Sequence, residues 1–265
     1  MKKIKDGVRE KNEMGEGFAA NYNQYIMPLK EKLVCIGVAA LAIYGVTFLF
    51  YRSHIISLIF CPLALLYPRI RTREIIKRRK YDLSIQFKDM LYSLASSLSA
   101  GKSVELAFRS LPEDLSLLYP DGNTDIIREV EYIIRKLDMN GTIESALEDF
   151  SDRADIEDIR SFVDVFHICK RSGGNIVEVI KNTSNIISDK IEIKQEINTM
   201  LAERKFEQKV LNVLPVFMMI LLSVCAGDYI EPVFTTLTGR IAASVSIILL
   251  IGAYFISKKI MDINL

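Results

Sequence analysis

The chain has 265 residues, of which 50% are hydrophobic and 25% are charged, and its formal net charge is +1. The charges are segregated: several long windows carry none, and the segments between them carry many, which excludes a simple soluble domain. Residues 81–200 hold 22 acidic and 13 basic residues, a net charge of −9. This acidic balance argues against a nucleic-acid-binding domain.

The chain begins with a polar N-terminal arm, residues 1–32, that contains both acidic and basic side chains. About 30 polar and charged residues precede the first apolar stretch, and that stretch is longer than the apolar region of a signal peptide. The sequence therefore predicts no cleavable signal peptide. We expect the arm to lie in the cytoplasm.

Four charge-free windows predict membrane-spanning helices. They cover residues 33–51, 53–68, 210–227 and 241–257. A spanning helix needs about 20 apolar residues, within a range of roughly 17–25. The second window is short and contains Pro62, so we expect it to span only if flanking arginines extend to the membrane interface.

The distribution of basic residues predicts the orientation. The N-terminal arm, the segment after the second window, the approach to the third window and the C-terminal tail are all rich in Lys and Arg. The positive-inside rule places these four regions in the cytoplasm, with 228–240 as a loop on the other side. An alternative with three spans would place residues 68–209 and the C-terminal tail on opposite sides of the membrane, which fits the rule less well.

The predicted fold is an all-α polytopic protein with transmembrane hairpins at 33–68 and 210–257, a cytoplasmic helical domain at 69–209, and a tail at 258–265.

A basic cluster follows the second window directly. We expect it to anchor the chain at the cytoplasmic membrane surface, where anionic lipid headgroups attract basic side chains. Its seven residues are Arg69, Arg71, Arg73, Lys77, Arg78, Arg79 and Lys80.

Apolar residues three and four positions apart predict helices throughout the cytoplasmic domain. The expected helices cover residues 81–98, 103–111, 124–138, 143–154 and 156–171, and a last helix begins near Ile176 and can run unbroken into the third window. Pro112, Pro120 and Asp121-Gly122 predict a loop over 112–123.

Glycines punctuate these helices. Gly101, Gly141, Gly173 and Gly174 each follow a helical stretch and precede another. Glycine allows one helix to stop and the next to begin at a close angle, so we expect a structural role for all four.

No arrangement of residues predicts catalysis, a metal site or a cofactor. Gly101-Lys102-Ser103 resembles the end of a phosphate-binding loop, but the required first glycine is replaced by Ser96 and a helix, not a strand, precedes it. His54, His167 and four separated cysteines form no triad or ligand set. The spans contain no Asp, Glu, Lys or Arg that would indicate a transport path.

An acidic stretch lies between residues 144 and 158. It is either a solvated helix face or a docking surface for a basic partner. In the second case, complementary charges would orient the partner and speed its association. Its members are Glu144, Glu148, Asp149, Asp152, Asp155, Glu157 and Asp158.

Several segments resemble the type II secretion system F domain family. They are Leu94–Gly101, the turn at Gly141–Leu147, Arg171–Ile180 with its Gly173-Gly174-Asn175 turn, and Leu214-Pro215. The resemblance covers about 81–223. The single copy of the domain, with two spans on each side, is similar to the inner-membrane platform proteins of tight-adherence pili.

The resemblance implies a non-enzymatic scaffold in the cytoplasmic membrane. The implied partners are a hexameric assembly ATPase, pilin or prepilin subunits, a paralogous platform protein and the lipid bilayer, in a homo- or hetero-oligomer. Two other classes remain open: a small membrane transporter or channel, and a signalling protein with a helical cytoplasmic domain. The uncharged spans argue against the first, and the setting of His167 argues against the second.

Overall fold

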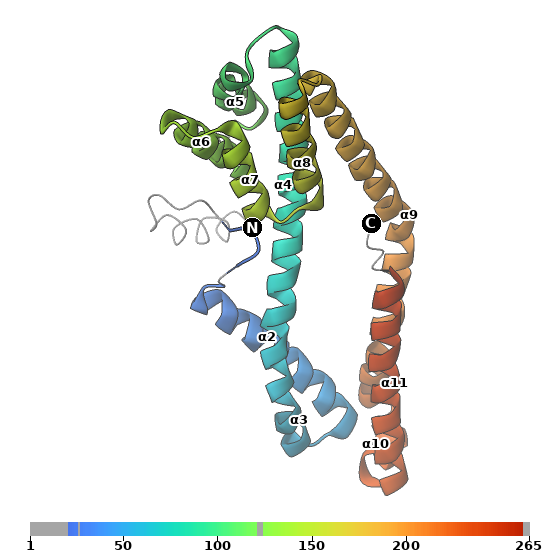
Figure 1. Ribbon diagram of the computed structural model, residues 1–265. Helices are drawn as coiled ribbons and strands as arrows, with labels where there is room; N and C mark the ends of the chain where they lie inside the picture. Colours follow the sequence, from blue (N-terminus) through green and yellow to red (C-terminus); the bar gives the residue numbers. More distant parts are fainter. Residues whose placement is uncertain (1–20, 26, 121–123, 262–265) are drawn as a thin grey trace. The chain divides into compact units, whose positions relative to one another are not determined.

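A computed structural model describes residues 21–25, 27–120 and 124–261. The described residues form α-helices and one 3-10 helix and contain no strand, which confirms the predicted all-α class (Figure 1). The elements are α2 (Leu29–Tyr51), α3 (His54–Phe60), η1 (Cys61–Leu66), α4 (Tyr67–Ser99), α5 (Val104–Leu118), α6 (Asp125–Asp138), α7 (Ile143–Ala154), α8 (Glu157–Ser172), α9 (Ile176–Cys225), α10 (Gly227–Thr235) and α11 (Leu237–Met261).

The chain divides into two compact units. The first unit consists of Met1–Pro28 and Thr72–Glu192, and the second of Leu29–Arg71 and Ile193–Leu265. Two helices, α4 and α9, contribute residues to both units. The units are therefore connected by continuous helices as well as by the residues that lead into α2.

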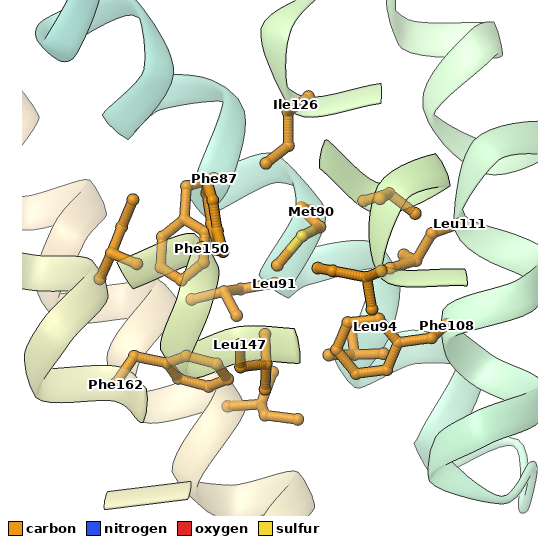
Figure 2. Close-up of a cluster of buried hydrophobic side chains, with 14 of the residues drawn as sticks. Phe87, Met90, Leu91, Leu94, Phe108, Leu111, Ile126, Leu147, Phe150 and Phe162 are labelled. Carbon is orange, nitrogen blue, oxygen red and sulfur yellow. The ribbon is translucent and has the colours of Figure 1, made fainter. Parts of the chain in front are cut away.

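The first unit is a helical bundle around one apolar core. The face of α4 that carries Phe87, Leu91 and Leu94 is fully buried. Figure 2 shows these side chains among others from α5, α6, α7 and α8. The ring centroids of Phe87 and Phe162 lie 5.5 Å apart in an edge-to-face arrangement, a favourable geometry for aromatic pairs.

The first part of α9 completes this bundle. Ile180 and Ile187 are buried seven positions apart, as expected for one face of a helix. Between them, the hydroxyl of Ser184 donates to the backbone oxygen of Lys88 on α4 at 3.4 Å. The N-terminal part of α9 is thus fixed to the bundle by both apolar and polar contacts.

The second unit contains long apolar helices whose side chains are mostly exposed. Leu41 on α2 is 76% exposed and Val224 on α9 is 80% exposed. Exposed apolar surface of this extent is typical of helices that face lipid. Four segments are long and apolar enough to cross a membrane: Leu29–Tyr51, His54–Ser99, Ile176–Cys225 and Leu237–Ser257. They contain the windows 33–51 and 241–257 completely, the window 53–68 except for Ser53, and the window 210–227 except for its last two residues. The hairpin arrangement and the orientation stay predictions.

Polar contacts connect helices within this unit. The hydroxyls of Tyr51 on α2 and Ser244 on α11 lie 2.7 Å apart. Arg52, in the turn after α2, donates to the hydroxyl of Ser223 on α9 at 2.8 Å. Its guanidinium also lies 5.4 Å from the ring centroid of Phe234 on α10.

Helical structure continues beyond the end of the second window, residue 68. Pro62 lies in the first turn of η1, where its missing N–H needs no partner, and helical structure then continues into α4. The expected helix start at residue 81 is therefore wrong, since α4 begins at Tyr67 and the basic cluster is helical. The charge-rich sequence masks the apolar period that identifies a helix.

Two expected loops are largely helical. Helix α5 continues through Pro112 to Leu118, so the predicted loop over 112–123 is wrong for 112–118, and residues 121–123 lie outside the described residues. Leu111 and Leu115 are fully buried on either side of Pro112, and this burial offsets the hydrogen bond that proline cannot make. In the expected loop 228–240, α10 occupies Gly227–Thr235.

Candidate functional site

The acidic stretch lies on α7, the turn after it and the first turn of α8. The hydroxyl of Thr142 accepts a hydrogen bond from the backbone N–H of Ser145 at 3.2 Å and so caps α7. Ile143, Leu147 and Phe150 bury one face of this helix in the core. The acidic residues of α7 are consequently directed away from the apolar core.

Four of the seven acidic residues form ion pairs within the bundle. Each pair joins the stretch to another helix, so these carboxylates already have partners inside the bundle. The pairs are Glu144 with Lys170 at 2.7 Å, Asp149 with Lys136 at 3.2 Å, Asp155 with Lys80 at 3.0 Å, and Asp158 with Lys190 at 2.9 Å.

The remaining three acidic residues, Glu148, Asp152 and Glu157, define the free acidic face. All three are exposed, and none forms an ion pair or hydrogen bond with a residue that the structure describes. Glu148 and Asp152 are four positions apart on α7 and therefore lie on the same side of that helix. These three carboxylates are the part of the predicted docking surface that is available to a partner.

Two of the paired carboxylates have lowered pKa values. The hydrogen bond from Lys80 and its positive charge lower the pKa of Asp155. For Glu144, burial acts to raise the pKa, but the hydrogen bond and charge of Lys170 outweigh it, so that the pKa is lowered. Both carboxylates are thus held in the ionised form that the ion pairs need.

A buried polar network lies beside the acidic stretch. The hydroxyl of Tyr22, from the N-terminal arm, donates to Oε1 of Glu129 at 2.8 Å. Arg153 donates to both oxygens of Glu129 at 2.7 Å, and its backbone oxygen accepts from the N–H of Tyr22 at 3.2 Å. Burial, followed by the negative charge of Glu129, raises the pKa of Tyr22, which keeps its hydroxyl protonated as a donor.

A second ion pair closes this network. Arg79 donates two hydrogen bonds to Asp125, at 2.9 and 2.8 Å, and its guanidinium lies 4.7 Å from the ring centroid of Tyr22. The bonds to Asp125 raise the pKa of Arg79. Sequence reasoning missed this network, because no periodic pattern in the arm distinguishes Tyr22 from its polar neighbours.

The basic cluster separates into two groups. Arg69, Arg71, Arg73, Lys77 and Arg78 are exposed on α4. Arg79 and Lys80 are half-buried and bind Asp125 and Asp155. Arg79 and Lys80 thus contribute ion pairs to the bundle, and the membrane anchor proposed for the seven residues stays a prediction.

The four predicted turn glycines lie between helices. Gly101 and Gly173 have φ values of 86° and 70°, in the left-handed region that favours glycine. At Gly141, a Cβ atom would lie 2.7 Å from the backbone oxygen of Lys136. Gly174 follows Gly173 in the turn where the side chain of Asn175 accepts from the N–H of Glu178 and caps α9.

The long apolar helices and the polar bundle define the chain as a helical membrane protein. The family model described as "Type II secretion system (T2SS), protein F" matches residues 90–224, which are 135 of the 265 residues. The chain belongs to this family, as its turn segments predicted. Proteins of the family are inner-membrane platform proteins, not known enzymes, and work in secretion machinery with ATPase and pilin-like components. Comparisons with curated proteins and with solved structures give no match.

Proposed function

We propose that the chain is the inner-membrane platform of a tight-adherence (Tad) pilus or a related type IV pilus or secretion machine, and that it couples a hexameric cytoplasmic ATPase to pilin polymerisation. The observation that carries this proposal is the family match over 90–224. A single family segment with two candidate spans near each end favours the TadB type over the TadC type. A paralogous platform protein and further copies of the chain complete the proposed assembly.

The proposed topology places both termini and residues 69–209 in the cytoplasm, between hairpins at 33–68 and 210–257. Its support is the exposed basic group on α4, which contains Arg69, Arg73 and Arg78 directly after the second apolar window. Basic residues next to a span are retained on the cytoplasmic side. Cysteine accessibility in intact cells tests this topology at the turn near Arg52 and at the α10–α11 junction, both of which it assigns to the outer side.

The proposed mechanism uses α9 to transmit displacement. This helix has 50 residues, begins in the bundle at Ile176 and ends at Cys225 within a candidate span. Apart from the bond that Pro215 cannot donate and the groups at the two ends, the backbone hydrogen bonds of α9 lie within the helix, so it resists bending more than a loop does. An ATPase that shifts the bundle would thereby shift the apolar part of α9.

A flexible insertion in α9 tests this mechanism. Seven glycines after Lys194 should abolish pilus assembly in the native host while the protein still inserts in the membrane. Seven alanines at the same site are the matched control, because they add about two helical turns and keep the helix continuous. Pili are counted by electron microscopy, and membrane insertion is checked by fractionation. Normal piliation with the glycine insertion would contradict the mechanism.

A further inference from the structure

A groove of about 350 Å³ lies where α4 ends and α5 begins. Its walls include Tyr92, Ser96 and Ser97 of α4, Asp114 of α5, and Lys102 of the turn between these helices. This size is at the lower end of the range for small-molecule sites. The groove belongs entirely to the bundle and is separate from the free acidic face.

The turn that carries Lys102 is fixed by backbone hydrogen bonds. The N–H of Gly101 donates to the oxygen of Leu98 at 2.9 Å, and the N–H of Lys102 donates to the oxygen of Ser97 at 3.2 Å. The hydroxyl of Ser103 then accepts from the N–H of Leu106 and caps α5. The backbone of Lys102 is thereby held at one place on the groove.

The ammonium group of Lys102 has only neutral partners. It donates to the hydroxyl of Ser97 at 3.3 Å and to that of Ser110 at 3.1 Å. An ammonium has three N–H donors, so one donor is left. Lys102 is half-buried, and no carboxylate of the described residues lies within 4 Å of its nitrogen. Taking a cation partly out of water without a counter-charge is costly, so an anion that enters the groove is stabilised.

Other partly buried cations of the bundle differ from Lys102. Arg79, Lys136 and Arg153 each contact a carboxylate at 3.2 Å or less. Lys102 is therefore the one of these four side chains that has no direct ion pair, although the carboxylate of Asp114 lines the same groove. The serine hydroxyls on its wall can donate further hydrogen bonds to an anion.

We infer that this groove binds a carboxylate group, with Lys102 as its counter-ion. Asp114 adds a negative charge to the same groove, which disfavours a phosphate dianion more than a carboxylate monoanion. Tyr92, which is 73% exposed, supplies an aromatic surface for the rest of the ligand. The carboxylate belongs either to a small organic acid or to an acidic side chain of a polypeptide. The inference does not depend on the proposed platform function.

The test uses trifluoroacetate as the probe and the full chain in lipid nanodiscs. Fluorine NMR line broadening should show saturable binding, and acetate should displace the probe. Lys102→Met should weaken binding about tenfold, the effect of losing one charged hydrogen bond. Lys102→Arg retains the charge and should bind nearly as well as the unaltered chain. Lys181→Met, at an exposed lysine of α9, is the matched control and should not change binding.

Other outcomes decide against the inference or identify the ligand. Equal binding by the Lys102→Met variant, or no saturable binding by the unaltered chain, overturns the carboxylate site. Stronger displacement by inorganic phosphate than by acetate overturns the choice of carboxylate. If N-acetylglutamate α-amide displaces the probe at lower concentration than succinate, the ligand is an acidic side chain, and the reverse order indicates a small acid. Circular dichroism confirms that each variant is folded.

Discussion

The hydroxyl of Tyr22 donates a hydrogen bond to the carboxylate of Glu129, which lies 107 positions further along the chain. Both residues are almost completely buried, at 1% and 2% exposure. Glu129 is also paired with Arg153, so one carboxylate joins the N-terminal arm, α6 and α7. This contact makes Tyr22, which precedes α2 in the chain, a structural part of the bundle.

Substitutions in this network should destabilise the bundle to different extents. Tyr22→Phe removes one hydrogen bond to a charged group and should lower the free energy of unfolding by about 1.5–3 kcal/mol. Glu129→Gln removes the carboxylate that binds Arg153 through two hydrogen bonds, and the 3.5 Å contact with Asp149 compensates only in part, so it should cost about 3–5 kcal/mol. Hydrogen–deuterium exchange of the α6 and α7 amides, measured by mass spectrometry, reports both losses.

Tyr92→Phe is the matched control for the tyrosine substitution. Tyr92 is exposed, and its hydroxyl has no partner among the described residues, so exchange in α6 and α7 should not change. If the amides of α6 and α7 exchange equally slowly in the Tyr22→Phe variant and in the unaltered chain, the hydroxyl of Tyr22 contributes nothing to the stability of the bundle.

The arm illustrates what the sequence could not predict. Helices α6, α7 and α8 follow from apolar residues at helical spacing, which is a local property. The contact of Tyr22 with Glu129 depends on how distant segments pack, and no local pattern encodes it. The same holds for Arg79 and Lys80, whose charges match those of their exposed neighbours. Only the positions of Asp125 and Asp155 in the fold distinguish these two residues.

The turn glycines should tolerate alanine to different degrees. Gly101 has a left-handed φ but open space around it, so Gly101→Ala should cost about 1–2 kcal/mol from backbone strain alone. At Gly141, the new Cβ would meet the backbone oxygen of Lys136 at 2.7 Å, so the turn itself must shift. Gly141→Ala should therefore destabilise the bundle more, as faster amide exchange at the end of α6 would show.

Gly101→Asn separates strain from packing, because asparagine tolerates the left-handed region better than alanine does. It should be less destabilising than Gly101→Ala. An equal effect of alanine at Gly101 and at Gly141 would contradict the role assigned to the Lys136 contact.

The pair of Lys80 and Asp155 should make stability depend on pH. Lys80 lowers the pKa of Asp155 in the folded chain, below the value of about 4 expected when unfolded. The pair therefore stabilises the fold above the unfolded pKa, and this stability is lost as the pH falls through the folded pKa. Because Asp155 is half-exposed, its contribution near neutral pH should be under about 1 kcal/mol.

Lys80→Met tests this pH dependence. The difference in amide exchange stability between the variant and the unaltered chain should be larger at neutral pH than at about pH 3, where the carboxylate is increasingly protonated. The bond from Lys80 to the backbone oxygen of Asp155 does not titrate and adds a constant term. A difference that is the same at both pH values would show that the carboxylate does not contribute.

Helix ends were harder to predict than helix positions. The loop expected from Pro112 onward followed from local turn signals, whereas burial of Leu111 and Leu115 keeps α5 continuous. The basic residues before Tyr81 gave no apolar period, yet α4 begins at Tyr67, because the preceding η1 already provides the first helical turns. In both places neighbouring structure outweighs the local preference of the sequence.

We propose that the ATPase of the proposed assembly docks on the free acidic face, and charge reversal tests this contact. Reversing Glu148, Asp152 and Glu157 to lysine should slow association of the ATPase with the chain in nanodiscs by about tenfold at low salt. The bundle should stay folded, because none of the three carboxylates has a partner within the described residues. Biolayer interferometry at several salt concentrations measures the association rate, which should depend less on salt in the variant.

The paired acids give the contrasting case. Asp149→Lys would lose the ion pairs with Lys136 and Arg153, so its effect on binding cannot be separated from damage to the bundle. The matched control is a triple reversal of Glu105, Glu113 and Glu131 to lysine, which changes the net charge equally at exposed acids of α5 and α6 that have no partner in the described chain. If that control slows association as much as the triple reversal does, net charge governs the encounter and the free acidic face is not the docking surface. If only the triple reversal acts, the ATPase contacts α7 and the start of α8.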